Sequence, residues 1–337
     1  MSQMQNKADR LVTIFGGSGF VGRHVVRALA KRGWRIRVAT RRPDLAGHLQ
    51  PIGKVGQINA VQANLRFPDS IAAALRGSDA VVNLVGILQE SGAQKFDIVQ
   101  AAGAKAVAEA AKAAGITQFV QMSAIGADAG SDSHYARSKA AGEAAVLAAI
   151  PTAIVLRPSI VFGPEDDFFN RFAAMARLAP ALPLVGGGDT KFQPVFAGDV
   201  GEAVAIALEG GATPGATYEL GGPEVKSFRD LLAYICKVIG RKRALVPIPF
   251  AAANLMGLGT EIAAKLAMGL FPSMLMITRD QVKLLQRDNV VSAAAMAEGR
   301  TLAGLGIKPE AIETIVPTYL HRFRKTGQYE RQNSLTG

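Results

Sequence analysis

The chain has 337 residues, of which 49% are hydrophobic and 19% charged, so it is long and apolar enough to bury a sizeable core. Its net charge is +11, but no basic block alternates with aromatic residues, which are only 6% of the chain; this argues against nucleic-acid binding. The single cysteine, Cys236, excludes an intramolecular disulfide framework, and the four histidines lack metal-ligand spacing. We therefore expect a reducing compartment, no metal site and no nucleic-acid partner.

The first predicted strand, residues 11–15, ends in a glycine-rich turn that opens into an amphipathic helix over 22–31. The turn can be read as Gly-x-Gly-x-x-Gly or as Gly-x-x-Gly-x-x-Gly. A bound pyrophosphate needs backbone N–H groups pointed at it from a helix N-terminus, and a side chain at the turn would block its approach. A plain structural turn is the alternative. The candidate cofactor-binding residues here are Gly16, Gly19, Phe20, Val21 and Gly22.

The second predicted strand, residues 35–40, is followed by two arginines, Arg41 and Arg42. A site that prefers NAD usually places an acidic residue at this strand end to hold the ribose hydroxyls. Guanidinium groups suit a 2′-phosphate better, so the sequence favours NADP(H). Asp44 keeps NAD(H) as an alternative, and solvated loop arginines are the alternative without a function.

Further apolar strands alternate with alanine-rich helices, which predicts an α/β fold, a Rossmann-type doubly wound parallel sheet with a smaller, mainly helical C-terminal lobe. We expect an NAD(P)-binding domain over 1–165, completed by about 194–222, and a substrate or partner lobe formed by 166–193 and 223–330. Asp199 with Glu202 predicts an N-cap and capping box for a helix within 195–208. The other predicted strands are 58–63, 80–85, 118–123, 152–156 and 218–220, and the other predicted helices are 68–75, 94–114 and 135–149.

Tyr135 and Lys139 form a Tyr-x-x-x-Lys pair at the start of the helix that follows the strand at 118–123. A spacing of four places both side chains on one helical face. A nearby ammonium favours the phenolate form of tyrosine, whose ordinary pKa of about 10 is too high for acid–base work near neutral pH. The lysine can also reach a nicotinamide ribose. An ordinary surface pair is the alternative.

The glycine turn, the Tyr135–Lys139 pair and the segment Leu-Arg-Pro-Ser-Ile-Val-Phe-Gly-Pro at 156–164 together resemble the short-chain dehydrogenase/reductase superfamily, in its extended or atypical branch, over about 11–220. This resemblance implies that Pro158 and Ile160 lie along the nicotinamide. It also implies a hydroxyl after the fifth strand that polarises the substrate oxygen. Ser123 is available, although the family's usual position falls nearer Ala124.

Four segments, at 48–57, 82–86, 162–172 and 193–195, make the resemblance closer. They are similar to the family of NADPH-binding accessory subunits of respiratory complex I, NADH:ubiquinone oxidoreductase, and its bacterial relatives, over about 11–325. In that family a tightly bound NADPH lies far from the electron path, and no turnover is established. The resemblance therefore implies a structural or sensing cofactor, with Asn64, Leu65, Leu84 and Gly86 among its contacts and respiratory subunits or a membrane surface as partners.

The alternative is a freestanding NAD(P)-dependent sugar-nucleotide epimerase/dehydratase or carbonyl reductase, which uses Tyr135 and Lys139 on a small-molecule substrate. Retention of this pair favours the enzyme, whereas Ala124 and the complex-I-like segments favour the subunit.

The polar N-terminus lacks the apolar core of a secretory signal, and no apolar run spans a bilayer without interruption. We expect a bacterial cytoplasmic protein, peripheral on the cytoplasmic face of the inner membrane; a processed organellar protein is the alternative. The apolar stretch at 262–277, with Arg279 and Lys283 nearby, is the predicted docking surface for lipid or a membrane-bound partner. A buried helix pair is the alternative reading of that stretch.

Overall fold

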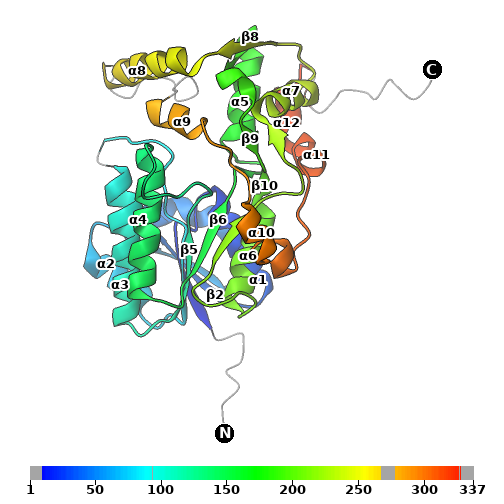
Figure 1. The fold of residues 1–337 in the computed structure, drawn as a ribbon. Helices are drawn as coiled ribbons and strands as arrows, with labels where there is room; N and C mark the ends of the chain where they lie inside the picture. The colour runs from blue at the N-terminus through cyan, green and yellow to red at the C-terminus, as the bar shows by residue number, and fades with distance from the viewer. Residues whose placement is uncertain (1–9, 93, 267–277, 326, 328–337) are drawn as a thin grey trace, which may run out of the picture. The chain divides into compact units, whose positions relative to one another are not determined.

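The computed structural model describes residues 10–92, 94–266, 278–325 and 327, and for 262–266 the backbone alone. The chain divides into two compact units (Figure 1). Unit 1 contains the described residues up to Ser159, together with Ala197–Gly221 and Val291–Pro309. Unit 2 contains Ile160–Phe196 and the described residues of Gly222–Val290 and of the chain from Glu310 onward.

A seven-stranded parallel sheet forms the centre of unit 1. Its strand order is β11-β6-β5-β4-β1-β2-β3, so the chain runs outward from β1 to β3 and then returns to place β4 on the other side of β1. Ligands in such sheets bind at the carboxyl ends of the strands where the order reverses, here the ends of β1 and β4. The strands are β1 (Leu11–Phe15), β2 (Arg35–Thr40), β3 (Ile58–Gln62), β4 (Ala80–Asn83), β5 (Gln118–Met122), β6 (Ile154–Pro158) and β11 (Thr217–Leu220).

Helices cover both faces of this sheet, as Figure 1 shows. The helices α1 (Phe20–Lys31) and α6 (Ala197–Leu208) lie on one face, and α2 (Pro68–Leu75), α3 (Gly103–Ala113) and α4 (His134–Ala149) lie on the other. Because both faces are covered, the central strands β1 and β4 are almost wholly buried, and apart from Thr13 and Asn83 their side chains are apolar. Glycine at 201 permits close packing of α6 on α1, because a Cβ there would lie 2.8 Å from the His24 carbonyl. The predicted fold class is confirmed.

Two details of the helices differ from the sequence-based prediction. The predicted helix at 94–114 is divided into a π-helix over Asp97–Ala102 and α3. The predicted capping role of Asp199 is wrong, because α6 begins at Ala197 and Asp199 lies inside its first turn. Glu202 instead forms an ion pair with Arg32, whose Nη2 lies 2.6 Å from the Glu202 carboxylate.

Residues 291–309, which the sequence assigned to the C-terminal lobe, lie with the sheet of unit 1. They contain α10 (Ala293–Ala297) and a short 3-10 helix, Ala303–Leu305. The segment is attached to β11 by hydrogen bonds from the backbone N–H of Ser292 to the Glu219 carboxylate and from Arg300 to the Thr217 carbonyl. These contacts join positions more than seventy residues apart, so no local pattern could reveal them.

Unit 2 is built around an apolar core rich in phenylalanine, to which α5 (Phe168–Leu178) and α7 (Phe228–Val238) contribute. Asp166 is buried beside it and accepts hydrogen bonds from the Tyr319 hydroxyl and the Gly163 backbone N–H. The remaining elements are β7 (Val161–Phe162), β8 (Ala181–Val185), β9 (Lys191–Phe192), β10 (Val195–Phe196), β12 (Lys226–Ser227), β13 (Ala244–Ile248), α8 (Phe250–Leu266), α9 (Arg279–Leu284), α11 (Ile312–Ile315), α12 (Pro317–Leu320) and the 3-10 turns Pro43–Ile52 (unit 1), Gly186–Gly188 and His321–Phe323.

The predicted docking stretch, 262–277, lies outside the described residues except for the backbone of 262–266. Arg279, which the prediction placed beside it, forms an ion pair with Glu261 at 3.2 Å. None of the described helices is long and apolar enough to cross a membrane.

Candidate nucleotide and catalytic site

At two positions of the predicted turn, the backbone of the chain requires glycine whether or not a ligand is bound. Gly16 has a φ of +79°, which L side chains rarely adopt, and a Cβ there would lie 3.3 Å from the Leu84 carbonyl carbon. A Cβ on Gly22 would lie 2.5 Å from the carbonyl oxygens of Gly16 and Gly17. The turn therefore folds tightly against the end of β4, independently of any ligand.

Gly19 is different, because a Cβ there would meet a single atom of the chain within 4 Å, the Gly16 oxygen at 3.4 Å. Gly19 is also the N-cap of α1, and no described side chain caps this helix. The first turn, which includes Phe20, Val21 and Gly22, contains no acidic residue. A helix N-terminus with these properties suits an anion, so the residues present fit the pyrophosphate of a dinucleotide.

At the end of β2, the two arginines differ in their contacts with Asp44. The Arg42 guanidinium binds both oxygens of Asp44, with Nε–Oδ1 at 3.0 Å and Nη2–Oδ2 at 2.7 Å, and this hydrogen bonding lowers the pKa of the Asp44 carboxyl. Arg41 is exposed and forms no ion pair among the described residues. Arg41 is thus the arginine available to a phosphate, and Asp44 is occupied by Arg42.

The residues after β3 have visible structural roles. The Asn64 side-chain oxygen accepts a hydrogen bond from the Arg66 backbone N–H at 3.2 Å and shapes the turn. Leu65 packs against the core beneath α3, where a Cβ on Gly103 would lie 2.9 Å from the Leu65 Cδ1. Their predicted contact with the nucleotide stays a prediction.

The segment after β4 connects the glycine turn to the predicted catalytic pair. The Leu84 backbone N–H donates to the Phe15 carbonyl at 2.9 Å and so extends the pairing of β4 with β1. Two residues later, a Cβ on Gly86 would lie 3.1 Å from the Lys139 Nζ. The structure therefore brings Gly16, Leu84, Gly86 and Lys139 to one edge of the sheet.

Tyr135 and Lys139 share one face of α4, with the Lys139 Nζ 5.9 Å from the Tyr135 ring centroid. The Lys139 ammonium also donates to the Met122 carbonyl at 3.5 Å. Burial lowers the pKa of Lys139 to about 8, against the opposing charge of Glu143. Burial raises the pKa of Tyr135 to about 12, so the expectation that the ammonium depresses it is wrong for the chain by itself. At neutral pH the phenol is protonated and suited to donate a proton.

Ser123, directly after β5, is 4% exposed, and its Oγ has no hydrogen-bond partner among the described residues. Its backbone N–H donates to the Leu156 carbonyl at 2.7 Å, which fixes the backbone position. A buried unsatisfied hydroxyl costs about 1–3 kcal/mol, so a native fold retains few of them. The peptide that joins Met122 to Ser123 also supplies the carbonyl that Lys139 contacts. Ser123 is therefore held at the same edge as Lys139 with an unused hydroxyl.

A partly buried ion pair lies one helical turn beyond Lys139. Glu143 is 6% exposed and accepts two hydrogen bonds from Arg157 of β6, Nε–Oε1 at 2.8 Å and Nη2–Oε2 at 2.5 Å. The carboxylate raises the pKa of Lys139 against its burial. The sequence analysis missed this pair, although Glu143 follows Lys139 at a spacing of four on a predicted helix.

Pro158 ends β6 in unit 1, and its carbonyl accepts a hydrogen bond from the Ile125 backbone N–H at 3.0 Å. Ile160 belongs to unit 2 and packs against the aromatic core there. The two predicted nicotinamide contacts thus lie in different units.

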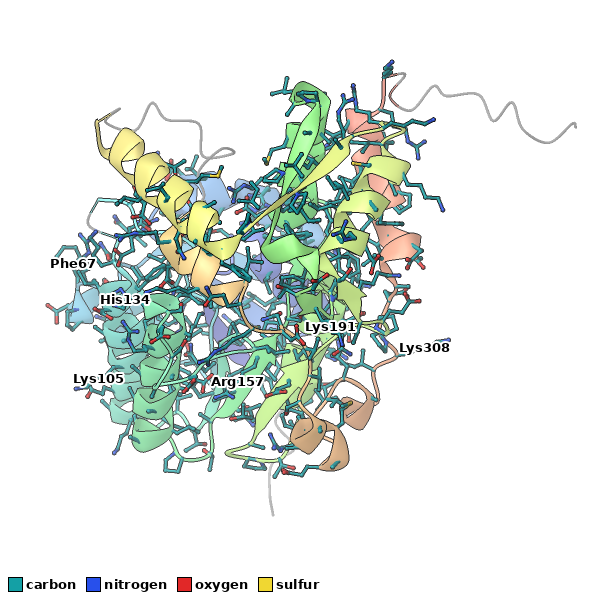
Figure 2. The ribbon with its side chains drawn as sticks, turned by 45° about the horizontal axis from the view of Figure 1, so that its top comes forward. Phe67, Lys105, His134, Arg157, Lys191 and Lys308 are labelled. Carbon is teal, nitrogen blue, oxygen red and sulfur yellow. The ribbon has the colours of Figure 1, made fainter. Side chains whose placement is uncertain are left out.

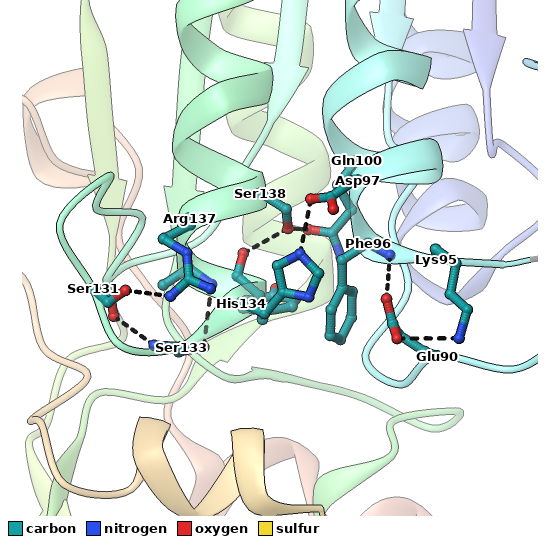
Figure 3. A network of polar contacts seen from close by, with 12 residues as sticks. Glu90, Lys95, Phe96, Asp97, Gln100, Ser131, Ser133, His134, Arg137 and Ser138 are labelled. Carbon is teal, nitrogen blue, oxygen red and sulfur yellow. Dashed lines mark hydrogen bonds and ion pairs between the residues drawn. The ribbon is translucent and has the colours of Figure 1, made fainter.

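An aromatic and polar network around the start of α4 was also absent from the sequence analysis (Figure 3). The Phe96 ring packs edge-on against Tyr135 and His134, with centroids 5.7 Å apart in each case. The His134 Nε2 lies 2.9 Å from the Asp97 carboxylate. These contacts fix the first turn of α4, from which Tyr135 projects.

The π-helix contributes a second attachment to α4, also visible in Figure 3. The Gln100 Oε1 accepts a hydrogen bond from the Ser138 hydroxyl at 3.2 Å, and its Nε2 donates to the Ile87 carbonyl at 2.6 Å. π-Helical turns occur frequently at functional sites. The prediction of one regular helix over 94–114 did not show that Gln100 faces α4, because a π-helical turn changes the direction of its side chain.

Buried amides join the ends of β4 and β5. The Asn83 Nδ2 donates to the Gln121 Oε1 at 2.9 Å, and the Asn83 Oδ1 accepts from the Val85 backbone N–H at 3.2 Å. Both amides are more than nine-tenths buried. Polar residues that end otherwise apolar parallel strands were the signal that could have identified them.

The family model for the NAD dependent epimerase/dehydratase family matches residues 12–221. The mitochondrial NADH dehydrogenase (ubiquinone) 1 alpha subcomplex subunit 9 of Arabidopsis thaliana is 34% identical, across 94% of this chain and 79% of that protein. Ceramide reductase of Caulobacter vibrioides is 31% identical, across 88% of this chain and 90% of that protein.

Among solved structures, the dTDP-glucose 4,6-dehydratase DesIV of Streptomyces venezuelae has the same fold, with a TM-score of 0.68 and 20% identity over 95% of this chain and 99% of that one. The resemblance inferred from the glycine turn, the Tyr135–Lys139 pair and the four complex-I-like segments is confirmed. The chain belongs to the NAD dependent epimerase/dehydratase family.

Proposed function

We propose that unit 1 binds NADP(H) and that the nucleotide has a structural or sensing role in a respiratory assembly, as the subunit relatives suggest. The observation that carries nucleotide binding is the first turn of α1. No described side chain caps it, it contains no acidic residue, and a Cβ on Gly19 would meet only the Gly16 oxygen within 4 Å. Backbone N–H groups there would hold the pyrophosphate. Unit 2 would carry the contacts to a substrate or partner.

The preference for NADP(H) is supported by the pairing of Asp44 with Arg42. A carboxylate that accepts two guanidinium hydrogen bonds has fewer lone pairs left for ribose hydroxyls, and its charge is already matched by Arg42. Arg41, which is exposed beside it, supplies positive charge for a 2′-phosphate.

The non-catalytic role is supported by Ala124, which stands where the family's usual catalytic hydroxyl falls. The nucleotide, when bound, would supply a hydride donor or acceptor. The chain's own contribution would be to fix the bound nucleotide through Lys139 and the β4 segment. We place such a protein on the cytoplasmic face of the inner membrane with respiratory subunits as partners.

One experiment tests both parts of this proposal. The protein would be isolated under native conditions from membrane and soluble fractions, and the nucleotide released on denaturation would be identified by mass. NADPH in stoichiometric amount, together with co-purifying respiratory subunits, is the expected result. Retention of NAD(H) would overturn the phosphate preference, and a soluble protein without partners would overturn the assembly.

A freestanding reductase, epimerase or dehydratase is the second candidate, and the unused Ser123 hydroxyl favours it. Ser123 would bind the substrate oxygen, and the protonated Tyr135 would donate a proton to it. The relative named ceramide reductase supports a carbonyl substrate. Oxidation of NADPH, followed with a panel of ketones and nucleotide sugars, would distinguish this candidate from a bound nucleotide that does not turn over.

A further inference from the structure

Unit 2 carries a cluster of cations that the nucleotide site does not use. The sequence contains no acidic residue between Asp230 and Glu261, and none over 314–329. Each of these two stretches contains a group of lysines and arginines, at 237–243 in the first and at 324–325 in the second. We define the cationic face by the six residues Lys237, Arg241, Lys242, Arg243, Arg324 and Lys325.

Hydrogen bonds hold these two stretches together beside the end of α7. The Arg324 Nε donates to the Val238 carbonyl at 2.8 Å, and the Arg241 Nε donates to the Phe323 carbonyl at 3.4 Å. The Arg243 Nε donates to the Ala176 carbonyl near the end of α5 at 2.6 Å. Figure 1 shows α5, α7 and α12 next to one another within this unit. The two basic stretches therefore lie side by side within this unit.

Two arginines of the face, Arg241 and Arg243, are oriented by backbone carbonyls. Among the described residues, Arg241, Lys242 and Arg243 form no ion pair, and Lys237, Lys242 and Lys325 are exposed. Favourable contact of cations with helix C-termini accounts for Arg243, for Arg324 and for Lys237 in the last turn of α7, but not for Lys242 and Lys325. Among the described residues, the charges of Arg241, Lys242 and Arg243 are therefore not compensated by a carboxylate.

An exposed leucine adjoins this charge. Leu178 is 69% exposed at the last position of α5, two residues after the carbonyl that Arg243 contacts. A surface that binds an acidic protein needs only the cations and not an exposed leucine. A cluster of four to eight lysines and arginines beside an exposed apolar side chain matches an anionic bilayer, whose headgroups attract the cations while its acyl region accepts the leucine.

We infer that the cationic face docks unit 2 on the surface of an anionic phospholipid membrane, with Leu178 inserted at the interface. This inference does not depend on nucleotide binding. It also differs from docking through 262–277, because it uses other residues of the same unit.

Co-sedimentation of the full-length protein with vesicles tests the inference. Vesicles of equal parts phosphatidylcholine and phosphatidylglycerol would be compared with phosphatidylcholine alone at low ionic strength. We expect binding to the anionic vesicles only, and weaker binding as salt increases. The triple variant Lys237→Gln, Lys242→Gln and Lys325→Gln removes exposed charges without touching the hydrogen bonds above. Each cation near an anionic surface changes partition about fivefold, so this variant should bind about a hundredfold more weakly.

The matched control is the triple variant Lys105→Gln, Lys112→Gln and Lys308→Gln in unit 1, which loses the same net charge from exposed positions (Figure 2 labels Lys105 and Lys308). We expect its partition to stay within about threefold of the parent protein. Leu178→Ser should weaken vesicle binding about tenfold. Equal losses in the two triple variants would show a net-charge effect and overturn the inference. Binding to poly-glutamate without binding to anionic vesicles would also overturn it and assign the face to an acidic protein.

Discussion

Two helices of unit 1 follow strands β1 and β5, and their first turns are satisfied differently. No described side chain caps α1, whose N-cap is Gly19, whereas the Ser133 hydroxyl caps α4 by accepting a hydrogen bond from the Ala136 backbone N–H at 3.3 Å. Among the described residues, no side chain takes up the first N–H groups of α1, which would leave them for a ligand. The second helix is completed by the protein, so its role is to hold side chains in place.

The residues around the N-terminus of α1 differ in the same way from those around the N-terminus of α4. Glycines and backbone carbonyls form the turn before α1, and a Cβ on Gly22 would meet two of those carbonyls. Around α4, the Phe96 ring and the Asp97–His134 pair fix the orientation of the first turn. A change at the first site should therefore act on binding, and a change at the second should act on chemistry.

The largest expected effect is at the α4 end, if the protein turns over a carbonyl or sugar substrate. Tyr135→Phe should lower kcat by roughly 10²–10⁴-fold, the usual contribution of a general acid or base. NADPH affinity should change little, because the hydroxyl acts on the substrate. Steady-state kinetics and a nucleotide titration on the same preparation would measure both.

A fully active Tyr135→Phe protein would contradict this assignment and leave the Tyr135–Lys139 pair as a structural feature. Ser123→Ala tests whether a loss of activity can be separated from a loss of stability, because the buried Ser123 hydroxyl makes no hydrogen bond among the described residues. It should lower kcat without loss of thermal stability, whereas removal of a structural hydroxyl would lower the melting temperature.

At the α1 end, Gly19→Val should weaken NADPH binding by at least about a hundredfold. The added side chain would stand over the first turn of α1, where the chain leaves space, and two charge-assisted hydrogen bonds of about 1.5–3 kcal/mol each would be lost. Isothermal titration calorimetry gives the affinity, and a thermal melt without nucleotide should be unchanged.

Gly22→Val provides the comparison, because its side chain would overlap the Gly16 and Gly17 carbonyls. That variant should lose stability even without nucleotide. Undiminished NADPH affinity in Gly19→Val would remove the helix N-terminus from the proposed site.

A smaller effect is expected at the end of β2. Arg41→Ala should weaken NADPH binding by about ten- to a hundredfold, which corresponds to one charge-assisted hydrogen bond, and should leave NADH affinity nearly unchanged. Parallel titrations with the two nucleotides measure the difference. Arg42→Ala should release Asp44 and improve NADH binding relative to NADPH. Equal losses for both nucleotides in Arg41→Ala would exclude recognition of the 2′-phosphate by this residue.

Sequence periodicity predicted the sheet well because its strands are determined locally. The strands at 11–15 and 35–40 and the helix at 68–75 have the predicted bounds, since apolar runs there end at glycine, arginine or proline signals. The attachment of 291–309 to β11 depends on hydrogen bonds from Ser292 and Arg300 to residues distant in the sequence.

The site was predictable to the extent that each residue type limits the chemistry. Glycines before a helix and a tyrosine four residues before a lysine are visible in the sequence. The protonation states are not, because burial decides them: the pKa of Tyr135 rises and that of Lys139 falls. The Arg42–Asp44 pair is local, but only the side-chain geometry shows that it occupies the carboxylate.

The smallest expected effect is a pH dependence at Lys139, whose Nζ would lie 3.1 Å from a Cβ on Gly86 in the segment after β4. Burial lowers the pKa of Lys139 to about 8, so the side chain is an ammonium below pH 8 and loses its charge as the pH rises through that value. Binding of an anionic dinucleotide favours the charged form, and NADPH affinity should therefore fall by about fivefold above pH 8, the difference between a charged and a neutral hydrogen bond. Fluorescence titration of NADPH from pH 6 to pH 10 would follow this step. Lys139→Met should bind more weakly and show no step. Glu143→Gln removes the carboxylate that raises the pKa of Lys139, so its step should move to lower pH, whereas a Lys139 remote from the nucleotide would give flat profiles in all three proteins.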